Sequence, residues 1–378
     1  MTGRADEMGG GRFTGRLAPS PTGALHLGNV RTFMVAWLRA RSRGGRVVFR
    51  MEDLDHPKDK PGAAAQAVED LKWLGFDWDE EYVQSARKPI YRAALDYLRT
   101  RAPGAPLVYP CVCSRRDVES AQSAPHAGEQ LHYPGTCRGR FASWEEALAF
   151  KTSPPPQTPK RPNLQTPKHP NSQTPKPPNL LPCWRFAVPA GTVVRFEDAF
   201  AGGYSQDVAA TLGDFPLARD ADGAGYTLAC TVDDLLMGVT EVVRGDDLLP
   251  ATPAQILLAR ALLPWAREVS AGEPLAPSYF HLPLVVGPDG RRLAKRHGDT
   301  RIAAFRAAGM RPEALLGALA ASCGWAKPGE ALTLADLLPR FDVRTIPHHP
   351  VTPASFLPLP KGCAAFVGCP LSFVHTSE

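Results

Sequence analysis

The stretch PSPTGALHLGN, residues 19–29, decides the fold class of this chain. The residues just before it, RFTGRL (12–17), have the composition of a short strand. From residue 27 to residue 41 apolar residues recur every three to four positions, which predicts an amphipathic helix. After two glycines a β-rich run follows, RVVFRME (46–52). A strand, a glycine-containing turn, a helix and a second strand form a βαβ unit, which is typical of a parallel sheet.

The same alternation continues to about residue 300. Further helices are expected at 62–75, 88–100 and 252–263, and GYTLACTVDDLLMGVTEVVRG (225–245) carries another helix and strand. Short strands are expected at WRFAV (184–188), GTVVRFEDAF (191–200) and HLPLVV (281–286). The sequence therefore predicts an α/β fold built on a Rossmann-like, doubly wound parallel sheet.

Length and composition exclude several classes of protein. The chain has 378 residues, of which 44% are hydrophobic and 21% charged, so it can bury a sizeable core and does not need a disulfide scaffold. It contains no run of about 18 apolar residues, so we expect no transmembrane span and no membrane partner. The first 16 residues lack the apolar region of a signal peptide, so a cytoplasmic location is expected.

A proline-rich stretch interrupts the chain at residues 151–182. Within it an octapeptide occurs three times, as QTPKRPNL, QTPKHPNS and QTPKPPNL, with almost nothing apolar to bury. This composition predicts a low-complexity insertion. Five of the 43 basic residues lie in this stretch, which holds no acid, so the rest of the chain is balanced at 38 basic and 38 acidic residues. A nucleic-acid partner must therefore be argued from motifs and not from net charge.

Two motifs have the composition of phosphate-binding segments. The first places His26, Gly28 and Asn29 where a strand gives way to a helix, and a helix N-terminus favours phosphate. A turn with a capping asparagine and an incidental histidine is the alternative. The second, RRLAKRHGD (291–299), carries five basic or histidine side chains on a glycine-flanked loop, which suits a polyphosphate. A solvated basic loop is the alternative there.

Three of the eight cysteines, Cys111, Cys113 and Cys137, fall within 27 residues. In a cytoplasmic protein this clustering favours a metal over disulfides. Tetrahedral zinc needs a fourth donor, and the residues alone leave His126 and His132 open. Unbound cysteines in a loop are the alternative, but an irregular segment of this size without a metal would lack a core. We therefore expect one structural zinc ion.

Taken together, these motifs resemble the signatures of the class I aminoacyl-tRNA synthetases. HLGN is similar to their HIGH motif and LAKRH (293–297) to their KMSKS loop. Four segments of the chain resemble the glutamyl members of this class more closely. They are GRLAPSPTGALHLGNVRT, FRMEDLD, GVTEVVRGDDLL and HLPLVV…LAKRHGD. The 78 residues after residue 300 are too few for the helical anticodon-binding region of a full glutamyl-tRNA synthetase. With the cysteine cluster, this favours the glutamyl-Q tRNA(Asp) synthetase family.

The resemblance implies a reaction and a set of residues. Members of that family activate L-glutamate with ATP and Mg²⁺ and transfer it to queuosine in the anticodon loop of tRNA(Asp). Matching positions imply that phosphate contacts and catalysis fall to His26, Asn29 and Lys295, with Gly28 also at the ATP. The glutamate contacts would be Arg16, Leu17, Ala18, Pro19, Ser20, Glu52, Tyr226 and Arg244. The zinc ligands would be Cys111, Cys113, Tyr133 and Cys137, with His132 as the substitute for Tyr133.

The expected organisation is a catalytic domain with one module inserted. We predict the first half of the catalytic domain at 12–106, a zinc module at 107–150, the proline-rich insertion at 151–182, the second half at 183–300 and a short, mostly helical C-terminal region at 301–378. Ala294 stands where the family usually has serine, so we expect slower activation. The alternative functions are a glutamyl-tRNA synthetase that charges the 3′ end of tRNA(Glu) and a non-catalytic binder of adenylates. The sequence does not predict the oligomeric state.

Overall fold

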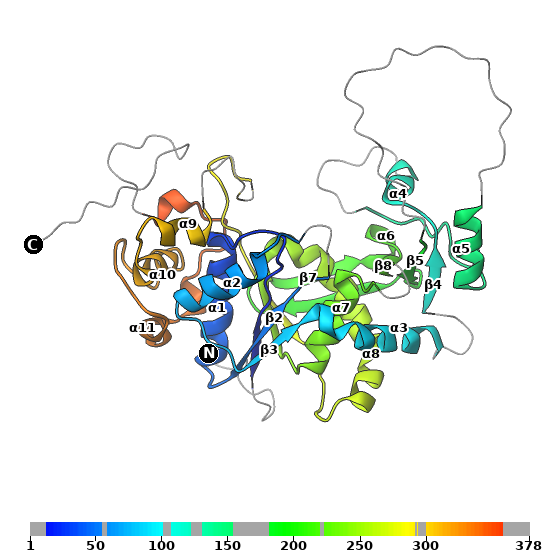
Figure 1. Cartoon of the computed structure of the whole chain (residues 1–378), viewed down its shortest axis with the longest axis horizontal. Helices are drawn as coiled ribbons and strands as arrows, with labels where there is room; N and C mark the ends of the chain where they lie inside the picture. The colour runs from blue at the N-terminus through cyan, green and yellow to red at the C-terminus, as the bar shows by residue number, and fades with distance from the viewer. Residues whose placement is uncertain are drawn as a thin grey trace, which may run out of the picture. The chain divides into compact units, whose positions relative to one another are not determined.

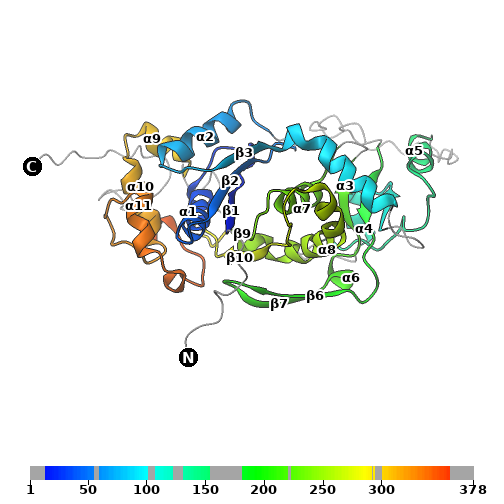
Figure 2. The same cartoon turned by 90° about the horizontal axis from the view of Figure 1, so that it is seen from below.

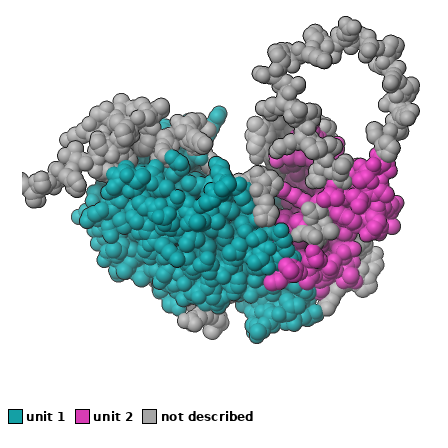
Figure 3. Space-filling model, viewed as in Figure 1, with its two compact units in different colours: residues 1–88, 194–206, 229–378 teal, residues 89–193, 207–228 magenta. Residues whose placement is uncertain are grey.

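The structure is a computed structural model, and it describes residues 13–54, 59–100, 107–121, 131–153, 181–219, 223–291, 293 and 300–357 (Figure 1). Most of the proline-rich insertion and residues 294–299 of the second motif lie outside this range. The chain divides into two compact units (Figure 3). Unit 1 consists of residues 1–88, 194–206 and 229–378, and unit 2 of residues 89–193 and 207–228. The domain boundaries expected from the sequence stay a prediction.

Unit 1 contains the parallel sheet. Its strands are β1 (Thr14–Leu17), β2 (Arg46–Met51), β3 (Glu80–Val83), β9 (Glu241–Gly245), β10 (Ser278–Leu282) and most of β6 (Val193–Asp198) and β7 (Gly202–Asp207). Its helices are α1 (Leu27–Arg41), α2 (Ala63–Trp73), α8 (Thr252–Val269), α9 (Ile302–Ala307), α10 (Pro312–Ala321), α11 (Leu334–Leu337) and the larger part of α7 (Tyr226–Leu236). Short 3₁₀ helices are η1 (Gln84–Arg87), η2 (Asp246–Ala251), η4 (Leu338–Arg340), η5 (Val343–Thr345) and η6 (Pro353–Ser355).

The strand order places the chain's switch point between β1 and β9. Strands β1, β2 and β3 pair in parallel in that order, and a second sheet has the order β7-β6-β10-β9. The two sheets meet where the Thr240 N–H, just before β9, donates to the Thr14 carbonyl at 2.9 Å (Figure 2). The chain thus winds outward from β1 in one direction and from β9 in the other. In such sheets ligands bind at the carboxyl ends of the strands on either side of the switch point.

Both faces of the sheet are apolar, as a doubly wound fold requires. Successive side chains of a strand point to opposite faces. Accordingly Val47 and Phe49 belong to the large core of unit 1, which includes α1, whereas Val48 between them packs with Met237 and Tyr279 in a smaller core. In Figure 2, α1 and α8 lie on opposite sides of the strands. These findings confirm the α/β fold class that the sequence predicts.

Unit 2 is built on a small antiparallel sheet with the order β4-β5-β8. It comprises α3 (Lys88–Thr100), β4 (Val108–Cys111), α4 (Arg115–Ala121), α5 (Trp144–Thr152), β5 (Cys183–Phe186), α6 (Val208–Thr211) and β8 (Phe215–Ala218). Cys111 pairs with Cys183 across β4 and β5, and the rings of Phe186 and Phe215 stack with centroids 5.0 Å apart. Strands of four residues are too short to give a period, which is why the cysteine-rich segment reads as irregular in the sequence.

Two elements differ from the sequence expectation. Strand β10 covers Ser278–Leu282 and not 281–286, because Pro283 has no N–H to continue the ladder. Helix α8 continues beyond the expected end and through Pro264 to Val269, since Trp265 and Ala266 in its last turns remain buried. The C-terminal region is helical from α9 to α11, as expected. Among the described residues, no helix is both long enough and apolar enough to cross a membrane.

Candidate functional site

The HLGN segment caps α1 with its own side chains. His26 is the N-cap residue, and its Nδ1 accepts a hydrogen bond from the Gly28 N–H at 3.1 Å. The Asn29 Oδ1 accepts from the His26 N–H, also at 3.1 Å. Since Nδ1 is an acceptor, the hydrogen of the neutral His26 ring lies on Nε2. The segment therefore offers an Nε2–H from His26 and an amide NH₂ from Asn29, both hydrogen-bond donors.

The segment that follows the second motif is bonded to the first. The Leu27 N–H donates to the Thr300 carbonyl at 3.1 Å, and the Ile302 N–H donates to the Leu25 carbonyl at 2.9 Å. On the other side of the loop, Leu293 is buried in the core of unit 1. The structure thus brings the end of the second loop to the N-terminus of α1. Lys295 itself lies outside the described residues, so its role stays a prediction.

Buried charges connect the proposed glutamate contacts at the ends of β1 and β2. Arg50 has no solvent exposure and donates to Glu52 Oε1 from Nη2 at 2.9 Å and to Asp234 Oδ1 from Nη1 at 2.7 Å. The same Asp234 oxygen lies 3.4 Å from the Nε of Arg16. The Glu52 N–H donates to the Pro19 carbonyl at 2.9 Å, which ties β2 to the RLAPS segment of residues 16–20.

This cluster is electrically balanced before any ligand binds. Arg16, Arg50 and Arg87 face Glu52, Asp233 and Asp234, with Arg87 Nε 2.7 Å from Asp233 Oδ1. Burial by itself would lower the pKa of Arg50, but the neighbouring carboxylates, first Asp234 and then Glu52, hold it above its ordinary value. Oε2 of Glu52 makes no hydrogen bond to any residue that the structure describes. That oxygen is available to a cationic group.

Arg244 is the last side chain of β9 before Gly245, and it is buried at 5% exposure. Strand β1 is linked to β9 next to Arg244, because Arg16 Nη1 donates to the carbonyl of the preceding residue, Val243, at 3.3 Å. Arg16, Glu52 and Arg244 therefore lie at the carboxyl ends of β1, β2 and β9, on both sides of the switch point. Tyr226 begins α7 in unit 2 and is 45% exposed, so its place among these residues stays a prediction.

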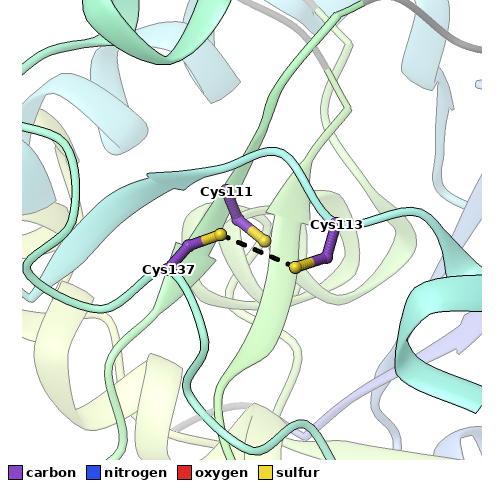
Figure 4. Close-up of side chains that lie close together, drawn as sticks. All are labelled: Cys111, Cys113 and Cys137. Atoms are coloured by element: carbon purple, nitrogen blue, oxygen red, sulfur yellow. Dashed lines mark hydrogen bonds between the residues drawn. The ribbon is translucent and has the colours of Figure 1, made fainter. Parts of the chain in front are cut away.

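The cysteine cluster lies in unit 2, where Figure 4 shows the three sulfur atoms turned toward one another. The sulfurs of Cys111, Cys113 and Cys137 all lie within 4.8 Å of one another, with Cys113 and Cys137 at 3.6 Å. The Tyr133 hydroxyl is 3.2 Å from the Cys111 sulfur and 3.6 Å from that of Cys113. By contrast, the His132 ring nitrogen Nε2 lies 3.3 Å from the Ala209 carbonyl.

These distances fit a tetrahedral zinc ion. With zinc–sulfur bonds of about 2.3 Å, the edges of the tetrahedron are about 3.7 Å, and somewhat shorter toward an oxygen ligand. The Cys113–Cys137 separation of 3.6 Å matches this edge, and so do the distances of 3.2 and 3.6 Å from the Tyr133 hydroxyl to the sulfurs of Cys111 and Cys113. Of the two side chains considered for the fourth ligand and described by the structure, Tyr133 lies with the sulfurs.

Arg185 supports this group from the side. Its Nε donates to the Cys111 sulfur at 3.2 Å, and its guanidinium carbon lies 3.8 Å from the centre of the Tyr133 ring. Hydrogen bonds from Cys113, then from Cys137 and Cys183, together with the Arg185 charge, lower the pKa of the Cys111 thiol below its ordinary value. The Arg185 charge beside the Cys111 sulfur favours the thiolate, which is the form that binds metal.

Sequence reasoning missed Arg50, Asp234 and Arg185 in these clusters, and also the buried pair of Asp198 and His281, whose side chains lie 2.6 Å apart. A signal for some of them exists in the sequence. Arg50 and His281 stand in strands whose other residues are mostly apolar, RVVFRM and SYFHL, and both are buried. A charged or titratable residue in a buried strand is rare unless it is paired, so such positions deserve consideration as functional. Which partner each residue has cannot be taken from the strand alone.

Comparison with known proteins gives matches over most of the chain. Residues 13–343 match the family model of the tRNA synthetases class I (E and Q), catalytic domain. The glutamyl-Q tRNA(Asp) synthetase of Symbiobacterium thermophilum is 44% identical, and the match covers 89% of this chain and 94% of that protein. The enzyme of the same name from Rhodopirellula baltica is 42% identical over 84% of this chain and 86% of its own length.

A solved structure supports the fold. The glutamate tRNA ligase from Elizabethkingia meningosepticum, crystallised with its amino acid, superimposes with a TM-score of 0.66 at 24% sequence identity. The superposition covers 90% of this chain and 67% of that ligase. At this identity the likeness extends to the fold of the catalytic domain, including the parallel sheet that carries the residues described above.

Proposed function

The chain belongs to the class I tRNA synthetases for glutamate and glutamine, in the glutamyl-Q tRNA(Asp) synthetase family, and from that membership we propose that its acceptor is queuosine in the anticodon loop of tRNA(Asp). It is a ligase that activates glutamate and transfers it to tRNA. The proposal adds the identity of the acceptor and the residues that act. It also includes a cytoplasmic location, where the tRNA acceptor is found.

One observation carries the assignment of the site. In unit 1, the donors of His26 and Asn29 stand at the N-terminus of α1, bonded to the segment that ends the second motif. Strand β1, which leads into that N-terminus, ends at the buried cluster of Arg16 and Glu52. A phosphate-binding helix end and an amino-acid cradle on neighbouring strand ends are the two parts that adenylate formation needs.

Glutamate would bind through opposite charges at its two ends. The free oxygen of Glu52 suits the α-ammonium group, and Arg16 and Arg244 suit carboxylates because a guanidinium can bond in a bidentate way. Because Arg50 holds the other Glu52 oxygen, the carboxylate is fixed before the substrate arrives. The backbone of residues 17–20 would line the same pocket, and the family resemblance adds Tyr226 as a further glutamate contact.

The reaction needs no general base, because the substrate carboxylate is already an anion. A carboxylate oxygen attacks the α-phosphorus of ATP in line, a new P–O bond forms, and the bond to pyrophosphate breaks. Catalysis then consists of positioning and of stabilising phosphate charge. Mg²⁺ bound with ATP would neutralise part of the phosphate charge. A queuosine hydroxyl next attacks the adenylate carbonyl carbon, which releases AMP and leaves an ester.

The chain's own donors would hold the phosphates. His26 would donate from Nε2 and Asn29 from its amide nitrogen, with Lys295 neutralising the leaving pyrophosphate. Gly28 keeps the histidine ring in place, since a Cβ there would lie 3.1 Å from the His26 Cε1. In unit 2, zinc held by Cys111, Cys113, Tyr133 and Cys137 would hold together the small core in which these residues pack.

Pyrophosphate exchange into ATP tests the activation step and its site. We expect exchange in the wild-type protein that depends on glutamate and not on glutamine or aspartate. Asn29→Asp keeps the oxygen that accepts from the His26 N–H but replaces the amide donor with a negative charge, so kcat should fall at least about 100-fold. Asn163→Asp, in the proline-rich insertion, is the charge-matched control. Normal exchange by Asn29→Asp would overturn the phosphate role, and wild-type protein without glutamate-dependent exchange would overturn the activity.

A further inference from the structure

Arg244 is held by two side chains that no glutamate contact explains. Its Nε donates to the Nε2 of His281 at 3.0 Å, and its Nη2 donates to the Thr252 Oγ1 at 2.7 Å. The Thr252 hydroxyl in turn lies 3.2 Å from the Leu248 carbonyl, its own acceptor. Nη1 of Arg244 makes no hydrogen bond within the part of the chain that the structure describes. Two of the three nitrogens are thus fixed by the protein, and the third remains for a ligand.

His281 lies beside Arg244 because β10 pairs in parallel with β9 in that register. The histidine is buried at 1% exposure, and its Nδ1 lies 2.6 Å from the Asp198 Oδ2. Since Nε2 accepts from Arg244, the hydrogen of the ring is on Nδ1 and is donated to Asp198. Burial lowers the pKa of His281 and outweighs the hydrogen bond to Asp198, which raises it, and the Arg244 charge lowers it further, so the neutral ring is favoured.

Asp198 is itself fixed by the backbone. Its Oδ1 accepts from the N–H groups of Phe200 at 3.0 Å, Ala201 at 2.8 Å and His281 at 3.1 Å. Asp198 is the last residue of β6, so the bonds from Phe200 and Ala201 form the turn into β7, and the bond from His281 ties Asp198 to β10. With one carboxylate oxygen held by the turn, the other stays in line with the histidine ring. The chain of contacts therefore runs from a rigid turn through Asp198 and His281 to Arg244.

We propose that Asp198 and His281 form a positioning pair for Arg244. The Asp198 carboxylate fixes the tautomer of His281, and His281 fixes the Arg244 guanidinium so that its remaining nitrogen can bind glutamate. This inference rests on the proposed function, because Arg244 must be a glutamate contact. An arginine that is already oriented loses less side-chain freedom when the substrate carboxylate binds. The pair acts through Arg244 and does not touch the reacting atoms.

The isosteric variant Asp198→Asn isolates this role. The amide oxygen can keep the three bonds from backbone N–H groups, while the amide nitrogen, a donor, replaces the carboxylate oxygen at Nδ1 of His281. The ring must then accept at Nδ1 and carry its hydrogen on Nε2, where it meets the N–H of Arg244. Two donors face each other, and the Nε2–H can turn only to the Thr252 hydroxyl 3.1 Å away, so Arg244 loses one of the two side chains that hold it. A tautomer reversed by such a substitution is known to impair catalysis while the geometry stays intact.

The measurement is glutamate-dependent pyrophosphate exchange, with KM determined separately for glutamate and for ATP. For Asp198→Asn we expect the KM for glutamate to rise about 10-fold and the KM for ATP to stay within about 2-fold. His281→Gln, whose amide oxygen can still accept from Arg244, should raise the KM for glutamate less than Asp198→Asn does. In the Arg244→Lys background Asp198→Asn should raise the KM for glutamate no further, because the residue it positions is gone.

Three results would overturn the inference. The first is an unchanged KM for glutamate in Asp198→Asn, and the second is an equal rise in the KM values for glutamate and ATP. The third is that Asp198→Asn raises the KM for glutamate as much in the Arg244→Lys background as in the wild-type protein, which would indicate a general structural role. If Asp198→Asn does not fold, as judged by thermal unfolding, His281→Gln carries the same test, alone and in the Arg244→Lys background. Absence of exchange in the wild-type protein would instead refute the proposed function, so the two failures are distinguishable.

Discussion

Replacing Glu52 by glutamine tests whether the buried charge cluster binds the ammonium group of glutamate. The Glu52 side chain is 8% exposed, and Arg50 occupies only its Oε1. A glutamine keeps the shape and an oxygen for Arg50 but removes the charge that faces the substrate. A hydrogen bond to a charged group contributes about 1.5–3 kcal/mol. We therefore expect the KM for glutamate to rise about 10- to 150-fold.

Folding should survive this change. Arg50 keeps Asp234 at 2.7 Å, so the arginine is not left without a counter-charge. The assay is pyrophosphate exchange with glutamate varied at saturating ATP and the reverse. Glu241→Gln is the matched control, because this buried glutamate, paired with Arg39, begins β9 at the end of the strand opposite to Arg244. A KM for glutamate that does not change in Glu52→Gln, or that rises equally in Glu241→Gln, would refute the reasoning.

Three further predictions concern stability and the metal. Cys113→Ser should abolish the retention of zinc on purification and lower the thermal midpoint by about 4 °C, equivalent to roughly 3 kcal/mol for a chain of 378 residues. Cys230→Ser, at a buried cysteine of unit 1, should leave the zinc content unchanged, and elemental analysis and calorimetry measure both quantities. Arg185→Met should speed the loss of zinc to a chelator, since the positive charge beside the Cys111 sulfur is removed, and equal rates for the two proteins would contradict that role. The folded state holds the pKa of His281 below its ordinary value of 6.5, so protonation of this ring opposes folding. The wild-type protein should therefore lose stability to denaturant as the pH falls from 7 to 5.5. His281→Gln, which takes up no proton at this position, should lose less stability over the same range.

The sequence predicts the parallel sheet and the ends of α1 because those signals are local. A glycine-containing turn between a strand and a helix of period 3.6 is contained in about 30 residues, and the phosphate donors His26 and Asn29 belong to the same stretch. Strand β10 begins three residues and ends four residues before the expected bounds, because one proline, Pro283, outweighs the apolar run in which it lies. Helix α8, in turn, passes Pro264 because burial of its last turns outweighs the missing hydrogen bond.

The partners of the buried polar residues could not be predicted in the same way. Asp198 and His281 are 83 residues apart, and Arg50 and Asp234 are 184 apart. Their contacts depend on which strands become neighbours and in what register. A shift of one residue between β9 and β10 would put His281 beside a different residue and turn its ring to the other face. No period or composition in a single sequence contains that register.

Transfer of labelled glutamate to defined tRNAs tests the central claim most directly. The acceptors are tRNA(Asp) with queuosine, the same tRNA with unmodified guanosine, the queuosine form without its 3′-terminal adenosine, and tRNA(Glu). The account predicts label on both queuosine forms, with or without the terminal adenosine, and none on the other two. Label on tRNA(Glu), or label that disappears when the terminal adenosine is removed, would contradict it and make the protein an enzyme that charges the 3′ end.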